Sequence, residues 1–428
     1  MNIIRMNCPT HRQQPENDAL QTGVSPPSLR SARKLDRQHG LTLVELMVAL
    51  VISSFLMIGL VQIFITSRTT YQVDEGLARL QENGRFAIDY LVRDLRMAGN
   101  MGCLGKIPPD KQEVVWNYLK NVTTGSPFDV STGIGGYEAT GTAPGATYVM
   151  PGLYPPTNVF ATTPALDPAT VGGAIAGTDV LAVRFMDGNA VPLANVGGKY
   201  HNLTEVFADA SATSLDQVYD IKDKTVVVVA NCKQAAVFQV TNALTGASPV
   251  SLVHDLSGNL GNSCAVWKSG GCKGYEDAFQ AGSMVGALRS RFYFVARNSR
   301  GAAPADGPSL FRRDAGLGQP TELVEGVENM QILYGIDSNT GNDTGRDGHG
   351  ADRYLTANNV TNWSRVVSVR IGLLVSTINS AGKADTSTDT STYTVAGVTL
   401  NVAGVDQNAN GNLRRRRVFT TTIGLRNL

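Results

Sequence analysis

Residues 40–67 read GLTLVELMVALVISSFLMIGLVQIFITS, and this stretch decides the architecture of the N-terminal part of the chain. From Leu41 to Ser67 it holds 27 residues, of which only Glu45 is ionisable. As a helix it would extend about 40 Å, whereas the hydrocarbon core of a bilayer is about 30 Å thick. The stretch therefore predicts a membrane-spanning helix.

The segment before this helix is basic. Residues 1–40 contain six Lys and Arg residues against three acidic ones, which favours keeping this end in the cytoplasm and sending the rest across the membrane. A secretory signal peptide or a plain single-span anchor are the alternatives. A signal peptide would have a shorter apolar region before a small-residue cleavage site. A plain anchor would not explain Glu45, because a carboxylate in an apolar span costs on the order of 3 kcal/mol.

Gly40, Leu41 and Glu45 together resemble the class III signal of type IV prepilins and pseudopilins. In those families a membrane-bound prepilin peptidase cuts after the glycine and methylates the new N-terminus. The resemblance therefore implies a leader over residues 1–40, cleavage between Gly40 and Leu41, and N-methylation of Leu41. The sequence departs from the commonest pattern in its long leader and in having Leu41 where Phe is usual. A start at Met6 instead of Met1 would shorten the leader without touching the motif.

Glu45 has a physical role in this interpretation. The α-amino group of Leu41 would lie one helical turn from Glu45 on the same side of the helix. Either charge alone would be costly to bury, whereas a pair between neighbouring subunits would cost less. We expect Glu45 to register this subunit against the N-terminus of an adjacent pilin.

The helix continues beyond residue 67. Apolar residues recur at spacings of three and four between Leu77 and Leu95, with charged residues between them, and Gly99 predicts the C-terminal end of the helix. We expect a membrane half over residues 41–67 and an amphipathic periplasmic half over residues 68–98, packed under a soluble domain.

Residues 99–428 are rich in Gly, Thr, Ala, Val and Asn, and they predict a β-rich globular domain that is loop-rich at 104–177. The fold class is α+β: a long N-terminal helix on a mainly antiparallel sheet with one buried face. The predicted strands cover 179–186, 225–230, 236–241, 289–296, 310–313, 330–336, 366–374 and 418–425.

Several segments narrow the resemblance to the PilW-type minor pilins: 96–103, 231–241, 323–337, 363–375 and 417–427. The resemblance implies a minor pilin that initiates a type IV pilus in a tip complex, with roles in adhesion and twitching motility. Its implied partners are other minor pilins, the major pilin, a PilY-type tip adhesin and the inner membrane. The implied locations are the inner membrane, with the C-terminal domain in the periplasm, and later the pilus tip. Alternatives are a J-type minor pseudopilin of a type II secretion system, or a tip-exposed adhesion or DNA-binding module.

The cysteines fit a translocated domain. Cys8 lies in the leader, and its removal leaves Cys103, Cys232, Cys264 and Cys272. An even number suggests two disulfides in an oxidising compartment, although free buried thiols are the alternative. Of the three pairings that four cysteines allow, we favour Cys264 with Cys272 and Cys103 with Cys232.

Other candidate sites carry less weight. A glycine-rich loop holds oxygen ligands that suit Ca²⁺, but it lacks the spacing of an EF-hand, so we favour a polar loop. Its candidate ligands are Asp337, Asn339, Asp343, Asp347 and Asp352. The basic run 414–417 is expected to be a solvated strand entrance. The net charge of +1 argues against nucleic acid as a partner, and no catalytic motif appears, so we expect no enzyme.

Overall fold

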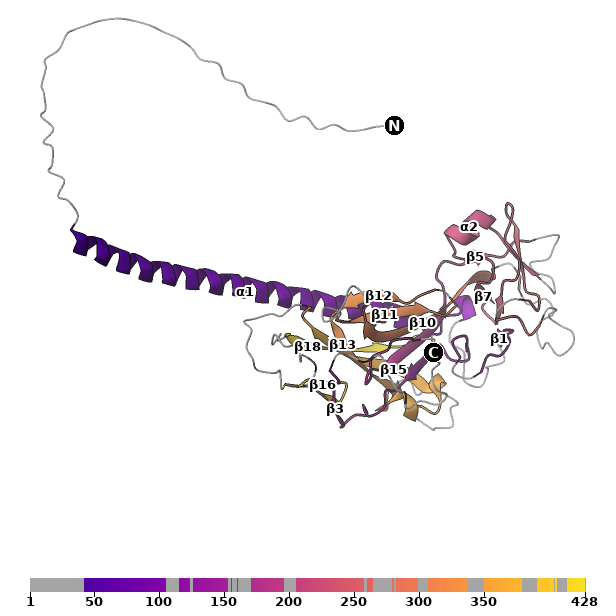
Figure 1. Cartoon of the computed structure of the whole chain (residues 1–428). Coiled ribbons are helices and arrows are strands. Elements are labelled where there is room, and N and C mark those ends of the chain that lie inside the picture. The colour runs from indigo at the N-terminus through magenta and orange to yellow at the C-terminus, as the bar shows by residue number, and fades with distance from the viewer. Residues whose placement is uncertain are drawn as a thin grey trace, which may run out of the picture. The chain divides into compact units, whose positions relative to one another are not determined.

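The chain is seen in a computed structural model, which describes a large part of the sequence after residue 41 (Figure 1). The described residues are 42–104, 115–123, 126–152, 155, 160, 171–195, 205–257, 260–264, 279–280, 282–298, 307–316, 318–337, 350–378, 391–403, 405 and 414–427. The chain divides into two compact units, Met1–Gln62 and Ile63–Leu428.

A single helix, α1 (Leu43–Met97), runs for 55 residues without a break. It begins after Thr42, and Gly99 follows its end with a φ of 74°, a left-handed conformation that glycine adopts without strain. Arg96 lies in the last turn, where a cation complements the helix dipole. The predicted helix is confirmed, whereas its division at residue 67 between membrane and periplasm stays a prediction.

A nine-stranded sheet forms around β10 (Met284–Arg297), the longest of the described strands. One path through it runs β1-β8-β7-β10-β11-β12, and on the other side β10 pairs with β4 and β5 while β2 pairs with β4. Its remaining strands are β1 (Val115–Asn117), β2 (Ile134–Tyr137), β4 (Val180–Met186), β5 (Val191–Pro192), β7 (Val226–Ala230), β8 (Ala235–Gln239), β11 (Pro308–Asp314) and β12 (Thr321–Glu325).

A second sheet has four antiparallel strands in the order β14-β13-β15-β18. Its strands are β13 (Val327–Ile336), β14 (Arg353–Leu355), β15 (Val366–Ser376) and β18 (Arg416–Gly424). Two small sheets complete the strands: β3 (Thr147–Val149) with β16 (Thr392–Val395) and β17 (Val398–Asn401), and β6 (Glu205–Ala208) with β9 (Val250–Val253). The short helices among the described residues are η1 (Gly102–Leu104), α2 (Ala212–Gln217), η3 (Ala357–Asn359) and η4 (Trp363–Arg365).

The two large sheets are joined by hydrogen bonds between the segment before β4 and strand β13. The side-chain amides of Asn329 and Gln331 both donate to the carbonyl of Gly177, at 2.8 and 2.9 Å. The backbone N–H of Asp179 donates to the carbonyl of Met330 at 2.9 Å. These buried polar groups satisfy one another, so they fix the sheets together without leaving an unpaired group.

The hydrophobic core draws on both helix and sheets. Leu80, Leu91 and Leu95 of α1 are fully buried in a cluster with side chains of β4, β10, β13 and β15. A separate cluster surrounds Phe238 and Leu215, between α2 and strands β6 to β10. The part of the chain from β5 to β9, residues 191–253, which we call the inserted region, therefore has a core of its own.

The α+β class and the mainly antiparallel sheets are confirmed, since among the described strands only β1 with β8 and β3 with β17 pair in parallel. All eight predicted strands overlap observed ones. The expectation of one buried face was wrong for the central strands: β4, β7 and β13 are buried at every residue. Strand β15 shows how a second face becomes buried. A Cβ on Gly372 would contact Val395 of β16, so another sheet covers the face of β15 that we expected to be exposed.

Candidate functional site: the N-terminal helix and its seat

The start of α1 is fixed by reciprocal hydrogen bonds between Thr42 and Glu45. The N–H of Glu45 donates to the Thr42 hydroxyl at 3.3 Å, and the N–H of Thr42 donates to Oε2 of Glu45 at 3.0 Å. This arrangement is a capping box, which satisfies backbone donors that the first helical turn leaves unpaired. Gly40 and Leu41 lie outside the described residues, so cleavage, methylation and the pairing of Glu45 with an N-terminus stay predictions.

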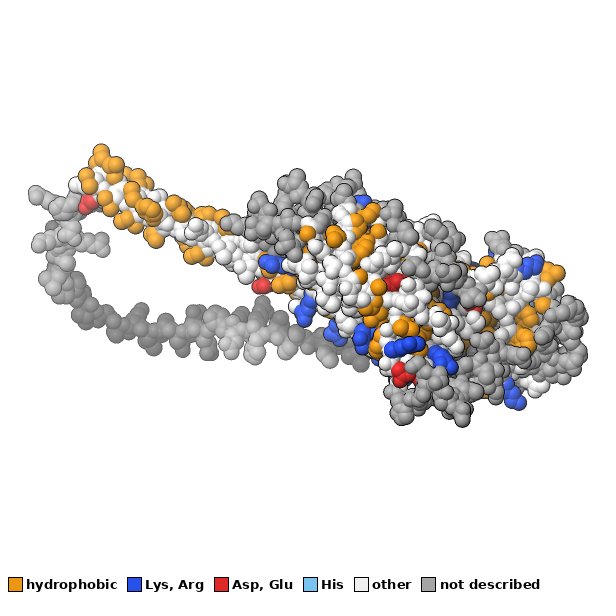
Figure 2. Space-filling model, turned by 90° about the horizontal axis from the view of Figure 1, so that it is seen from below, with side chains coloured by type: hydrophobic (Ala, Val, Ile, Leu, Met, Phe, Trp, Pro, Cys, Tyr) orange, Lys and Arg blue, Asp and Glu red, His pale blue; other side chains and the backbone are white. Residues whose placement is uncertain are grey.

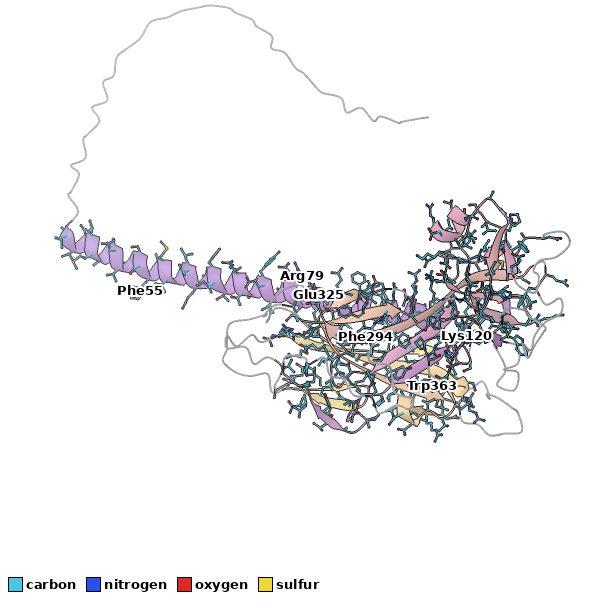
Figure 3. The ribbon with its side chains drawn as sticks, turned by 45° about the vertical axis from the view of Figure 1, so that its right-hand side comes forward. Phe55, Arg79, Lys120, Phe294, Glu325 and Trp363 are labelled. Carbon is cyan, nitrogen blue, oxygen red and sulfur yellow. A yellow bond between two sulfur atoms is a disulfide. The ribbon has the colours of Figure 1, made fainter. Side chains whose placement is uncertain are left out.

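The first part of α1 exposes large apolar side chains. Leu43 is 76% exposed and Phe55 70%, and an 18-residue window of the helix reaches a mean hydropathy of 2.5 with none of it buried in the protein. Apolar side chains surround this part of the helix (Figure 2), and Phe55 points away from it (Figure 3). The hydroxyls of Ser53 and Ser54 donate to the carbonyls of Leu50 and Val51, so they add no unpaired polar group. Such a surface requires an apolar environment, a membrane or other helices.

The later part of α1 packs against the β-rich domain. Gly84 faces Phe419 of β18 so closely that an added Cβ would lie 2.7 Å from Cδ2 of the ring and nearer still to Cε2 and Cζ. Beside it, the side-chain amide of Asn83 donates to the carbonyl of Glu325 at 3.2 Å. A glycine is needed at position 84 because helix and strand approach this closely.

An ion-pair network holds the same helix to β10. Asp94 is 4% exposed, and its two carboxylate oxygens accept from Nη1 of Arg291 at 2.9 and 2.8 Å, while the Tyr293 hydroxyl donates to Oδ2. Nε of Arg291 also donates to Asp314 at 2.9 Å. Burial lowers the pKa of Arg291, but the charge of Asp94 and its hydrogen bonds outweigh burial and leave that pKa raised. The network therefore keeps both charges in place inside the interface.

Asp94 was missed at the sequence level, although a signal was present. It lies between Leu91 and Leu95, and all three face the buried side of the helix. A carboxylate within the apolar stripe of an amphipathic helix indicates a buried partner.

The end of α1 is tied to the inserted region by a disulfide. Cys103, in η1, is bonded to Cys232 with a Cα–Cα distance of 4.5 Å, which is the pairing that we favoured. Cys264 is also disulfide-bonded. Cys8 and Cys272 lie outside the described residues. The Cys103–Cys232 bond spans a sequence separation of 129 residues and so constrains the unfolded chain strongly.

Two carboxyl groups are buried near the junction of the sheets. Asp179 accepts hydrogen bonds from the N–H groups of Ala139 and Ile332, at 2.9 and 2.8 Å. Burial raises the pKa of Asp179 from 3.8 to about 7, although these two bonds oppose the shift. Burial, and then the charge of Asp179, raises the pKa of Glu138 from 4.5 to about 9. The pair holds at least one proton at neutral pH, and nothing in the sequence pattern indicated it.

The expected calcium loop is only partly visible. Asp337 is 1% exposed and Asp352 is exposed, whereas Asn339, Asp343 and Asp347 lie outside the described residues. Among the residues that the structure describes, no group of three His, Cys, Asp or Glu side chains could hold a metal ion. The calcium site stays a prediction.

The expectation that the whole basic run 414–417 is solvated was wrong for Arg416. The side chains of Arg416 and Glu328 are fully buried, and Nε of the arginine lies 2.6 Å from Oε2 of the glutamate. A charge buried in this way needs an opposite charge beside it, and the sequence did not identify Glu328 as that partner.

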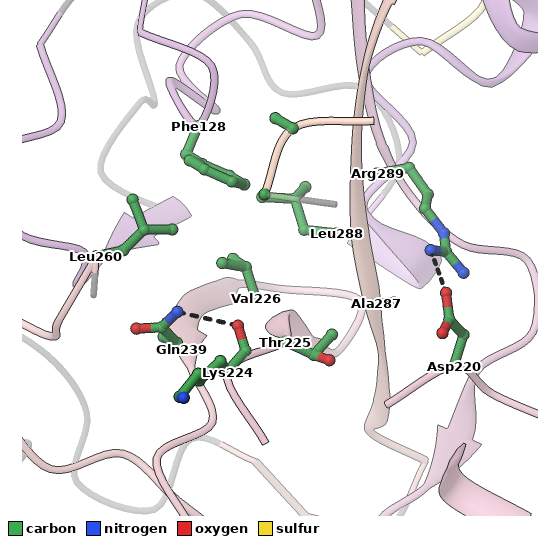
Figure 4. A pocket seen from close by; sticks show the side chains of 12 residues that line it. Phe128, Asp220, Lys224, Thr225, Val226, Gln239, Leu260, Ala287, Leu288 and Arg289 are labelled. Atoms are coloured by element: carbon green, nitrogen blue, oxygen red, sulfur yellow. Dashed lines mark hydrogen bonds and ion pairs between the residues drawn. The ribbon is translucent and has the colours of Figure 1, made fainter. Parts of the chain in front are cut away.

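A cavity of about 360 Å³ lies between the inserted region and β10 (Figure 4). Apolar side chains of Phe128, Val226 and Leu260 line it, and Arg289 beside it is paired with Asp220 at 2.6 Å. The carbonyl of Lys224 accepts from the Gln239 side chain at 2.9 Å. Most polar groups of its wall are thus used within the fold.

Comparison with known families identifies two matches. Residues 292–427 match the family described as PilW, type IV pilus-assembly protein W, and this range covers β10 from Phe292 through β18. Residues 35–61 match the prokaryotic N-terminal methylation motif, which spans Gly40 to Glu45 and much of the exposed apolar helix. No curated protein and no solved structure gives a significant match. One N-terminal apolar helix together with this motif fits a membrane-anchored protein of the pilus that the prepilin peptidase processes. These two matches support a pilin of the PilW type with a class III signal at its N-terminus.

Proposed function

We propose that this chain is a minor pilin that initiates type IV pilus assembly as part of a tip complex with other minor pilins. The observation that carries the proposal is the dual character of α1. Its first part exposes apolar side chains such as Phe55, while its later part is held in the domain by Gly84 and Asp94. A single helix can then insert among other apolar helices while presenting a folded domain outside them.

Before assembly, the first part of the helix would anchor the chain in the inner membrane, with residues 99–428 in the periplasm. The disulfide between Cys103 and Cys232 supports this location, because the periplasm is oxidising and the cytosol is not. After cleavage at Gly40, the α-amino group of Leu41 and the carboxylate of Glu45 would register neighbouring subunits, since a paired charge costs less in an apolar filament core.

A position at the tip is supported by the size of the domain. A subunit repeated along a helical filament contacts copies on both sides, whereas a terminal subunit leaves one side free. The inserted region adds strands β5 to β9 and a core of its own, which a terminal position accommodates. The free side would face a PilY-type adhesin, and the other side would face minor pilins and then the major pilin. The role is structural, and we propose no catalysis.

A J-type minor pseudopilin would share the N-terminal motif. The match over residues 292–427 is to a pilus-assembly family, which favours the pilus over secretion.

The test is deletion of the gene in its native host, followed by complementation and counting of surface pili by electron microscopy. We expect few or no pili in the deletion strain and full recovery with the wild-type gene. Glu45→Val should fail to restore pili although the protein accumulates. Glu75→Val is the matched control, because Glu75 is an exposed acid of the same helix that forms an ion pair with Arg79. Normal piliation in the deletion strain would overturn the proposal.

A further inference from the structure

Strand β18 has an open edge. It is the last strand of the order β14-β13-β15-β18, and its nine residues pair with β15 in continuous register. Other edge strands in the described part of the chain are shorter: β12 has five residues and a register shift beside it, and β14 has three. Proteins usually shorten, bend or block exposed edges, because such edges pair with other chains. β18 has none of these features and contains no proline or lysine.

The register shows which backbone groups of β18 point outward. The N–H of Leu425 donates to the carbonyl of Val367, and the N–H of Thr377 donates to the carbonyl of Arg415, at 2.8 and 2.9 Å. In an antiparallel pair every second residue makes such bonds, so the odd-numbered residues of β18 bond to β15. The N–H and C=O groups that point away from β15 belong to Val418, Thr420, Thr422 and Gly424. These groups form a row of backbone donors and acceptors with which another strand could pair.

The charge along this edge is positive. Arg415, Arg417 and Arg426 are exposed, and no acidic residue occurs between 415 and 427. Arg417 lies over the ring of Phe419, with its Cζ 5.7 Å from the ring centroid. None of these three arginines forms a salt bridge with a described residue of the chain. Carboxylates on an incoming strand would therefore meet unpaired cations at both ends of the edge.

We propose that β18 binds an extended, acidic segment of a different pilus subunit as an added fifth strand of this sheet. The proposal rests on the proposed function, since it names the surface through which the tip complex would form. A second copy of this chain fits poorly. Antiparallel pairing of two β18 strands about Thr420 would bring Arg426 opposite Arg414, and like charges directly opposite each other are destabilising.

Hydrogen exchange tests the added strand directly. The mature full-length protein, in detergent micelles, is mixed in turn with each purified minor pilin of the same host and with its major pilin. We expect one of them to slow exchange at the amides of Val418, Thr420 and Thr422 at least about tenfold, because a new ladder bond protects each of them. A complex that leaves these amides unprotected overturns the proposal, and so does the absence of any complex. Protection that rises with the concentration of this chain alone would identify a second copy and also overturn it.

A proline substitution at the edge distinguishes the contribution of the backbone N–H to binding from that of the side chain. Thr420→Pro removes one outward N–H and leaves the bonds to β15 intact, whereas Thr420→Ala keeps the N–H and is the control. We expect Thr420→Pro to weaken binding at least about tenfold, about 1.4 kcal/mol, and Thr420→Ala to change it less than about twofold. An unchanged melting temperature of the free protein shows that the fold survives. Equal binding by both variants would overturn the proposal.

Counts of surface pili distinguish failure of the added-strand proposal from failure of the proposed assembly role. Full piliation with Thr420→Pro, in a host where gene deletion abolishes pili, would refute the added strand and leave the assembly role standing. Normal piliation after deletion would refute the assembly role itself.

Discussion

Gly84 of α1 and Phe419 of β18 lie so close that no side chain fits between them, and Gly84→Ala should weaken the packing of the helix against the β-rich domain. An alanine Cβ would lie 2.7 Å from Cδ2 of the ring, whereas carbon atoms in favourable contact are about 3.5–4.0 Å apart. The ring or the helix must therefore move by about 1 Å, and overpacking of this kind costs about 1–3 kcal/mol. Alanine recovers about 1 kcal/mol of helix propensity, so the net loss should be about 1 kcal/mol.

The assay is urea unfolding of the mature protein in detergent, with a double-mutant cycle. In a Phe419→Ala background the clash is gone, so Gly84→Ala should become stabilising by about 1 kcal/mol. Gly59→Ala is the control, because nothing lies within 4 Å of a Cβ at that position, and it should leave unfolding of the β-rich domain unchanged. Refutation would come from a Gly84→Ala protein that is as stable as the wild type, or from an effect whose sign does not reverse without Phe419.

Three further changes probe the same account. Asp94→Ala leaves a largely buried arginine without its main partner and should cost about 3 kcal/mol in urea unfolding, whereas Glu75→Ala, which removes an exposed pair of the same helix, should cost less than about 0.5 kcal/mol. Glu138 has a folded-state pKa above its ordinary value, so the stability that its protonation contributes is complete below pH 4.5 and is lost as the pH rises to about 9. The stability of Glu138→Gln relative to the wild type should therefore rise across that range, by up to about 1.4 kcal/mol per pH unit. Curves of stability against pH that run parallel for the two proteins would contradict this. Cys103→Ser removes the bond to Cys232 and should lower the free energy of unfolding by about 4 kcal/mol under oxidising conditions. Thermal melts with and without a reductant would check this, because a reductant can no longer destabilise the variant through that bond.

The elements predicted correctly from the sequence are those whose signal is local. The apolar run from Leu41 and the three-and-four spacing to Leu95 each depend on residues within one helix, so α1 was predicted as a whole. Strands with alternating side chains, such as β15 and β18, were found for the same reason. The short strands β1, β2 and β3 lie in the region expected to be loop-rich, and their positions were not predicted because three or four residues carry too little pattern.

What could not be predicted depends on partners far apart in the sequence. Arg416 is buried because Glu328 lies beside it, 88 residues earlier in the chain, and Asp94 is paired with Arg291, 197 residues later. The full burial of β13 likewise depends on distant segments, since Gln331 bonds to the carbonyl of Gly177 while Met330 and Ile332 lie in the core that includes Leu91 of α1. A single sequence shows the charges and the apolar residues but not which of them meet.

The most direct test of the central claim is the mass and sequence of the N-terminal peptide of the mature protein, isolated from its native host. The account predicts a chain that begins at Leu41 with one added methyl group on its α-amino nitrogen, in both wild-type and Gly84→Ala protein. A Gly40 substitution that blocks the peptidase should leave the leader attached and abolish surface pili. A mature chain that keeps residues 1–40, or that begins elsewhere without methylation, would contradict the account.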